Sequence, residues 1–125
     1  MNAAAVTKLL ICEDDPRVRQ TLSRVAGSQA DLEVVAAVDN GEDAIEFATD
    51  PGVDVIVLDL HLPTIDGVEV IRLLRERGVT SPVVVLSADD RGAGRLVGFD
   101  DVSFLSKGTS GALDVLAAIR GSVAP

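Results

Sequence analysis

Residues 55–63 read VIVLDLHLP, and this stretch decides the fold. Four apolar residues, Val55–Leu58, run directly into Asp59. A short, continuous apolar run of this kind is typical of a strand buried on both faces, as in a parallel sheet. Because burying a lone carboxylate is costly, we expect Asp59 to have partners at the end of this core strand, unless it is an ordinary strand-end acid that faces solvent.

Segments typical of strands alternate with segments typical of helices along the rest of the chain. We predict strands at 8–12, 32–38, 53–58, 82–86 and 102–105, and helices at 16–28, 42–49, 68–77 and around 113–119. Asp15 followed by Pro16 is a favourable helix start, because an N-cap acceptor precedes a residue whose φ suits the first turn. Strands alternating with helices indicate a parallel sheet covered on both faces. Five such units predict a doubly wound α/β fold with strand order 2-1-3-4-5.

The segment from Asp89 to Asp101 is the weakest part of this pattern. It should contain a fourth helix, but it reads DDRGAGRLVGFDD and holds Gly92, Gly94 and Gly98. Each glycine destabilises a helix by roughly 1 kcal/mol relative to alanine. We therefore expect an atypical fourth helix that is short or irregular.

Composition limits the class of protein. The 125 residues, 47% of them hydrophobic, suffice for one globular domain, so we expect residues 1–125 to form a single domain. The net charge of −9 and the lack of Trp and Tyr argue against direct nucleic-acid binding by this domain. We find neither the run of about 18 apolar residues that a membrane span needs nor a signal peptide in residues 1–8. A single cysteine, Cys12, excludes an internal disulfide and favours a reducing compartment, so we expect a cytoplasmic protein.

Residues with charged or reactive side chains follow the predicted strands at one edge of the sheet, where doubly wound folds bind ligands. Glu13 and Asp14 follow the first strand, and Asp59 follows the third. Ser87 follows the fourth strand and Lys107 the fifth. Three neighbouring carboxylates repel one another unless one is protonated or a cation lies among them, and oxygen ligands of this kind favour Mg²⁺. The residues at this edge therefore predict a site that binds a phosphoryl group, which Asp59 can accept as an aspartyl-phosphate.

Four pieces of sequence, in this order, resemble the receiver domains of two-component response regulators. They are ICEDDP, VIVLDLHLPTIDG, VVVLSADD and FLSKGTS, and each lies at the end of a predicted strand. The resemblance covers nearly the whole chain and implies the flavodoxin-like (CheY-like) form of the fold. EDDPRVRQTL, LEVVAAVDNGEDAI and KGTS, which replaces a Lys-Pro pair, resemble receivers that precede a helix-turn-helix DNA-binding domain. The sequence as given holds no such effector domain, so we expect either a truncated regulator or a stand-alone receiver.

The resemblance implies a role for each residue at this edge. Asp59 resembles the phospho-acceptor and a ligand of the metal, and Lys107 resembles the phosphate-binding lysine. Asp14 resembles a direct ligand of Mg²⁺ (or Mn²⁺), and Glu13 resembles one that acts through water. The backbone carbonyl of His61 would be a further protein ligand of the metal.

The resemblance also implies a switch and its partners. Ser87 resembles the hydroxyl that bonds the phosphoryl oxygen, and Phe104 resembles the aromatic residue that follows it inward. Pro63 and Gly67 shape the loop after Asp59. A separate sensor histidine kinase would donate the phosphoryl group, and the changed surface would regulate transcription through an effector domain. Homodimerisation on activation stays open, and the chain would catalyse only its own phosphorylation and dephosphorylation.

His61 is the unusual residue of this site. It lies two positions after Asp59, as Asp89 lies two positions after Ser87. We hypothesise that His61 and Asp89 lie near each other and tune the access of the water that removes the phosphoryl group.

Two other functions remain open. The glycine-rich segment favours an interaction module that binds its partner whether or not it is phosphorylated, although the complete set of acids and Lys107 counts against it. A metal-dependent phosphatase of related topology would carry a second aspartate at the position of His61. Cys12 is expected to be a small core residue, the alternative being a nucleophile that uses His61 as its base.

Overall fold

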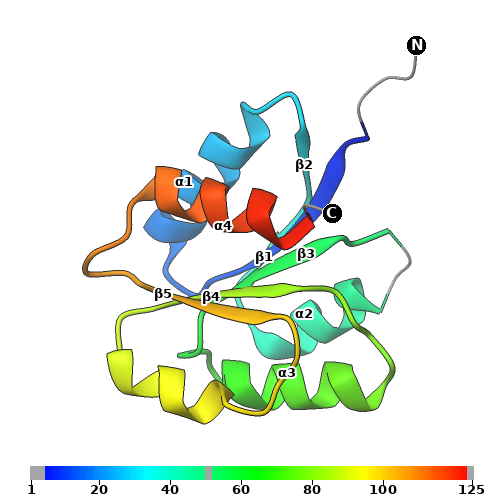
Figure 1. Cartoon of the computed structure of the whole chain (residues 1–125), viewed down its shortest axis with the longest axis vertical. Coiled ribbons are helices and arrows are strands. Elements are labelled where there is room, and N and C mark those ends of the chain that lie inside the picture. The colour runs from blue at the N-terminus through cyan, green and yellow to red at the C-terminus, as the bar shows by residue number, and fades with distance from the viewer. Residues whose placement is uncertain (1–4, 50–51, 124–125) are drawn as a thin grey trace.

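A five-stranded parallel sheet forms the centre of the computed structural model, which describes residues 5–49 and 52–123 (Figure 1). The strands are β1 (Thr7–Cys12), β2 (Leu32–Val38), β3 (Val55–Leu58), β4 (Val83–Ser87) and β5 (Val102–Ser106). Their order is β2-β1-β3-β4-β5 and every pair is parallel, which confirms the predicted doubly wound sheet. Residues 1–4, part of the segment assessed for a signal peptide, lie outside the described residues.

Helices cover both faces of the sheet. On one face lie α1 (Pro16–Gly27) and α4 (Ala112–Val123), and on the other lie α2 (Gly41–Ala48), α3 (Gly67–Glu76) and the 3₁₀ helix η1 (Asp90–Leu96) (Figure 1). Because side chains alternate across a strand, Leu9 and Ile11 of β1 pack under α1 and α4, whereas Leu10 and Cys12 pack toward α2 and α3. Within the described residues, no helix combines the length and hydropathy needed to cross a membrane.

The boundaries of the elements follow from local hydrogen bonds. Asp15 caps α1 as predicted, since its Oδ1 accepts a hydrogen bond from the amide of Arg17 at 2.9 Å. The predicted strand at 53–58 begins two residues late, at Val55, because Asp54 bonds Lys8 with its side chain as well as its backbone. The Asp54 amide donates to the Lys8 carbonyl, and the Asp54 carboxylate accepts from the Lys8 amide, each at 2.8 Å.

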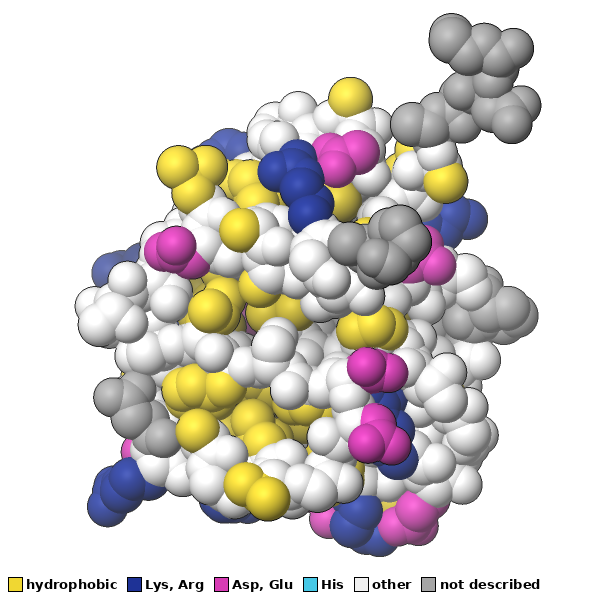
Figure 2. All heavy atoms as spheres, viewed as in Figure 1, with side chains coloured by type: hydrophobic (Ala, Val, Ile, Leu, Met, Phe, Trp, Pro, Cys, Tyr) yellow, Lys and Arg dark blue, Asp and Glu magenta, His cyan; other side chains and the backbone are white. Residues whose placement is uncertain are grey.

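The fourth helix is short and irregular, as the glycines predicted. In η1 the chain forms seven residues of 3₁₀ helix, and Gly92 lies so close to Leu60 that a Cβ there would be 2.6 Å from Leu60 Cδ1. So short a helix covers little of the sheet. Val97 is 84% exposed, and Phe99 and Phe104 are only half-buried. Figure 2 accordingly shows hydrophobic side chains at the surface over the area between β5 and η1.

Candidate functional site

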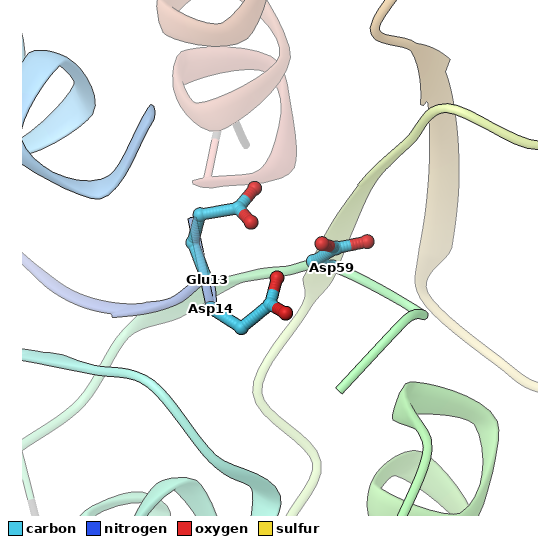
Figure 3. A group of neighbouring side chains, drawn as sticks. All are labelled: Glu13, Asp14 and Asp59. Atoms are coloured by element: carbon cyan, nitrogen blue, oxygen red, sulfur yellow. The ribbon is translucent and has the colours of Figure 1, made fainter. Parts of the chain in front are cut away.

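Three carboxylates meet at the carboxyl edge of the sheet. Glu13 and Asp14 follow β1, and Asp59 follows β3, the strand that pairs with β1 in the register Cys12 to Leu58. The two strand ends therefore lie side by side, and carboxylate oxygens of all three acids come within 4.8 Å of one another (Figure 3). Glu13 is 2% exposed and Asp59 4% exposed, while Asp14 is exposed. The burial of Asp59 rules out the alternative of a solvent-facing acid.

Lys107 neutralises part of this charge. Its Nζ lies 2.6 Å from Glu13 Oε1 and 3.1 Å from Asp59 Oδ2. The backbone amide of Lys107 donates to the Ser87 carbonyl at 2.9 Å, which fixes the end of β5 against the end of β4. One ammonium group thus bridges two buried carboxylates that come from different strands.

Burial and neighbouring charges both change the pKa values of Glu13 and Lys107. Burial raises the pKa of Glu13; the hydrogen bond from Lys107 opposes this rise, and neighbouring Asp59 adds to it. Partial burial disfavours the Lys107 ammonium, but hydrogen bonds to Glu13 and Asp59 outweigh it and raise the pKa of Lys107. We take the ionised pair as the neutral-pH state, because opposite charges 2.6 Å apart favour each other's charged form.

The three acids differ in how far the protein already occupies their oxygens. Asp59 accepts from the His61 amide at 3.1 Å and from Lys107, and Glu13 accepts from the Asp15 amide at 3.1 Å and from Lys107. The Asp14 carboxylate accepts no hydrogen bond from the described residues. Oxygen donors at this spacing fit a hard divalent cation such as Mg²⁺, with Asp14 the freest to bind it directly. That the His61 carbonyl is a ligand stays a prediction.

The two predicted switch residues lie next to this edge. Ser87 is the last residue of β4, is fully buried, and its Oγ accepts from the Asp89 amide at 3.3 Å. Phe104 is a half-buried residue of β5 that packs against the core under η1. Its Cε2 would lie 3.9 Å from a Cβ at Gly92. Their positions suit a path from the site to η1, while their switching roles stay predictions.

His61 and Asp89 approach each other across the mouth of the site, as predicted. The distance from His61 Nε2 to Asp89 Oδ2 is 4.0 Å, and the two side chains are 59% and 34% exposed. Their effect on hydrolysis remains a hypothesis.

Cys12 is a core residue, as expected. It is fully buried, and its Sγ donates weakly to the Asn40 carbonyl at 3.4 Å. Burial, with neighbouring Asp59 and Glu13, raises the pKa of the thiol to about 12, which leaves no thiolate for nucleophilic chemistry near neutral pH.

Three features of the site were not predicted from the sequence. The guanidinium of Arg19 in α1 donates to the Glu13 carbonyl at 2.9 Å. Arg95 of η1 pairs with Asp66, the N-cap of α3, at 2.7 Å. The sequence predicted that Gly67 shapes the loop, but it did not predict that a Cβ there would lie 2.6 Å from the Asp59 carbonyl oxygen. For Arg19 a signal existed, because a cation in the first turn of a helix opposes the helix dipole.

Comparisons with known proteins point to one family of domain. The family model described as "Response regulator receiver domain" matches residues 9–119. The chain is 42% identical over 98 residues to the transcriptional regulatory protein PrrA of Mycobacterium tuberculosis, covering 75% of this chain and 41% of PrrA. It is 30% identical over 123 residues to the nitrate/nitrite response regulator protein NarL of Escherichia coli (strain K12), covering 93% of this chain and 54% of NarL. The chain thus spans about half the length of these curated relatives or less.

One solved structure illustrates the agreement in fold. The response regulator domain of CheB from Thermotoga maritima superposes with a TM-score of 0.82 at 24% identity, covering 96% of this chain and 99% of that chain. The agreement confirms the predicted flavodoxin-like (CheY-like) class of fold.

Proposed function

Because this chain belongs to the family of response regulator receiver domains, we propose that Asp59 accepts a phosphoryl group from a sensor histidine kinase. The carrying observation is the buried Asp59 carboxylate, which lies among two other acids and 3.1 Å from an ammonium group. An ionised carboxylate is a nucleophile that needs no base. The neighbouring charges suit a phosphoryl group, whose transition state is stabilised mainly by positioning and electrostatics.

In the proposed step, an Asp59 oxygen forms a bond to phosphorus while the bond between phosphorus and the imidazole nitrogen of the donor histidine breaks. The bonding electron pair leaves with the imidazole. Lys107 is close enough to Asp59 to donate a hydrogen bond to an incoming phosphoryl oxygen. His61 holds the other Asp59 oxygen through its backbone amide, which fixes the orientation of the carboxylate.

The donor set also suits the predicted metal ion. Asp14 and Asp59 would hold Mg²⁺ or Mn²⁺ directly, and Glu13 would hold it through water, because Lys107 lies closer to Glu13, at 2.6 Å, than to Asp59, at 3.1 Å. The His61 carbonyl would complete the protein ligands. Such an ion, when bound, neutralises charge on the phosphoryl oxygens.

After transfer, the new dianion would attract the Ser87 hydroxyl, and Phe104 would move inward with the loop after β4. The surface formed by η1, β5 and α4 would change in response. Local charge changes of this kind bias a two-state element, which is how such switches work. The hydrophobic side chains exposed between β5 and η1 belong to this proposed output surface (Figure 2).

The output of the switch is a further proposal. PrrA is named a transcriptional regulatory protein, and this chain covers only 41% of it. We therefore propose that the receiver acts on transcription through an effector domain, with pairing of two copies as one route. The chain would not act as an enzyme on other substrates, and its cytoplasmic location stays a prediction.

Acetyl phosphate tests the phosphorylation directly. The intact mass of the wild type should increase by one phosphoryl group only when Mg²⁺ is present. Asp59→Asn should abolish this gain, whereas Asp39→Asn, an exposed acid beyond β2, should leave it unchanged. Absence of any gain in the folded wild type would favour the phosphorylation-independent interaction module, which the short η1 also favours. Sustained hydrolysis of a phosphate ester would instead favour the phosphatase.

The hypothesis on His61 has its own measurement. The lifetime of the aspartyl-phosphate in His61→Ala should differ from that of the wild type, because the imidazole and Asp89 flank the mouth of the site. Equal lifetimes would end the hypothesis.

A further inference from the structure

The guanidinium of Arg19 lies against the backbone of the acidic pair. Its Nη1 is 2.9 Å from the Glu13 carbonyl oxygen and 3.4 Å from the Asp14 carbonyl oxygen. Both residues lie beyond the last residue of β1, and no backbone amide of the described residues donates to either oxygen. The bond to the Glu13 carbonyl is partly buried, so this carbonyl needs a donor, which the Arg19 side chain supplies. The longer bond to the Asp14 carbonyl is exposed.

These two carbonyls belong to the peptide groups on either side of the Asp14 Cα. A side chain that bonds both carbonyls restrains both peptide planes, the first more strongly than the second, and therefore restrains the direction in which the Asp14 Cβ points. Asp14 needs this support more than the other acids. Lys107 and backbone amides hold the carboxylates of Glu13 and Asp59, whereas the exposed Asp14 carboxylate accepts nothing from the described residues.

Helix stability does not explain an arginine at this position. The N-terminal end of a helix favours anions, yet the first turn of α1 contains no acid, and Arg19 is its fourth residue. Arg17, two residues earlier, is exposed, and its side chain makes no hydrogen bond with the described residues. Arg19 is half-buried and contacts the loop of the acids. The two arginines therefore differ in contacts while sharing charge and helix turn.

We propose that Arg19 is a positioning residue of the cation site, which orients the Asp14 carboxylate for the divalent cation through the two carbonyls. The inference rests on the proposed function, in that the cation is the one that phosphoryl transfer would use. Residues that support metal ligands typically change affinity by roughly tenfold to a hundredfold when replaced.

If Arg19 acted only through its charge, its removal would change the Mg²⁺ affinity in the opposite direction, so one measurement separates the two explanations. Removing a positive charge near a cation site should strengthen Mg²⁺ binding slightly, and Arg17→Gln and Arg19→Gln remove the same charge from the same turn. If Arg19 positions Asp14, Arg19→Gln weakens Mg²⁺ binding by roughly tenfold or more. Arg17→Gln then leaves binding unchanged or slightly tighter. Arg19→Lys keeps the charge but replaces the planar guanidinium, whose Nη1 makes both contacts, by an ammonium group, and falls between wild type and Arg19→Gln.

Isothermal titration of the unphosphorylated protein with MgCl₂ measures this affinity without any reaction. Equal or tighter Mg²⁺ binding by folded Arg19→Gln, compared with Arg17→Gln, overturns the inference, and so does a wild type that binds no Mg²⁺. If Arg19→Gln does not fold, Arg19→Lys against Arg17→Lys decides in the same way. At saturating MgCl₂ the phosphorylation rate of Arg19→Gln should approach that of the wild type, which a general structural defect would prevent. Weaker Mg²⁺ binding in a protein that acetyl phosphate never modifies would support Arg19 and refute only the phosphorylation.

Discussion

Replacing Gly67 by alanine should damage the fold and the site together. Gly67 is the first residue of α3, and its amide donates to the Leu60 carbonyl at 2.8 Å. A Cβ at this position would lie 2.6 Å from the Asp59 carbonyl oxygen and 2.7 Å from the Leu60 Cα. Both are backbone atoms, so no side-chain rotation can relieve the contact.

The size of the effect follows from a comparison with a glycine in open space. Gly121 lies inside α4, and a Cβ there would meet nothing within 4 Å. Gly121→Ala should therefore stabilise the protein by roughly 0.5–1 kcal/mol, the usual helix preference for alanine. Overpacking of a closely packed position costs roughly 1–3 kcal/mol, and Gly67→Ala should lie in the upper part of this range. We expect the two variants to differ by about 2–4 kcal/mol in free energy of unfolding.

Urea denaturation followed by far-UV circular dichroism measures both variants against the wild type. The backbone shift that Gly67→Ala imposes acts on Asp59 directly, so phosphorylation by acetyl phosphate should also slow, with no such change in Gly121→Ala. A Gly67→Ala protein as stable as the wild type would refute the reasoning, because it would mean that the loop after β3 can move away from α3 at no cost.

Three further predictions concern groups around the site. Lys107→Met removes the cation that two buried carboxylates share, and should destabilise the metal-free protein by about 3 kcal/mol. This value is at the lower end for a broken buried pair because Lys107 is partly exposed. In urea denaturation, Mg²⁺ should restore more stability to this variant than to the wild type, and equal gains would contradict the prediction. Arg95→Gln breaks the exposed pair with Asp66, which is worth about 0.2–1 kcal/mol. The free energy of unfolding should therefore hardly change, while amide hydrogen exchange in η1 accelerates. Arg91→Gln should not accelerate this exchange. The raised pKa and burial of Cys12 predict that iodoacetamide leaves it unmodified in the folded protein at mildly alkaline pH and alkylates it in urea; rapid alkylation without urea would show that the thiol is accessible.

Sequence by itself determined the fold and the location of the site. The apolar run Val55–Leu58 required burial on both faces, and its alternation with helical segments left few arrangements other than a doubly wound parallel sheet. Because the carboxyl ends of parallel strands share one edge, residues that follow different strands had to meet there, as Glu13, Asp14 and Asp59 do. The glycines of η1 predicted its short, irregular form, since their helix penalty is a local property.

Only the tertiary structure decided which side chains support that site. The contact of Arg19 with two carbonyls, the pair between Arg95 and Asp66, and the approach of Gly67 to the Asp59 carbonyl each join different elements at distances set by packing. Periodicity in sequence identifies the face of a helix, but it does not fix the few tenths of an ångström or the rotamer on which such contacts depend. The edge where these acids meet is therefore a consequence of strand direction, whereas the orientation of each carboxylate depends on contacts between segments that only the folded packing brings together.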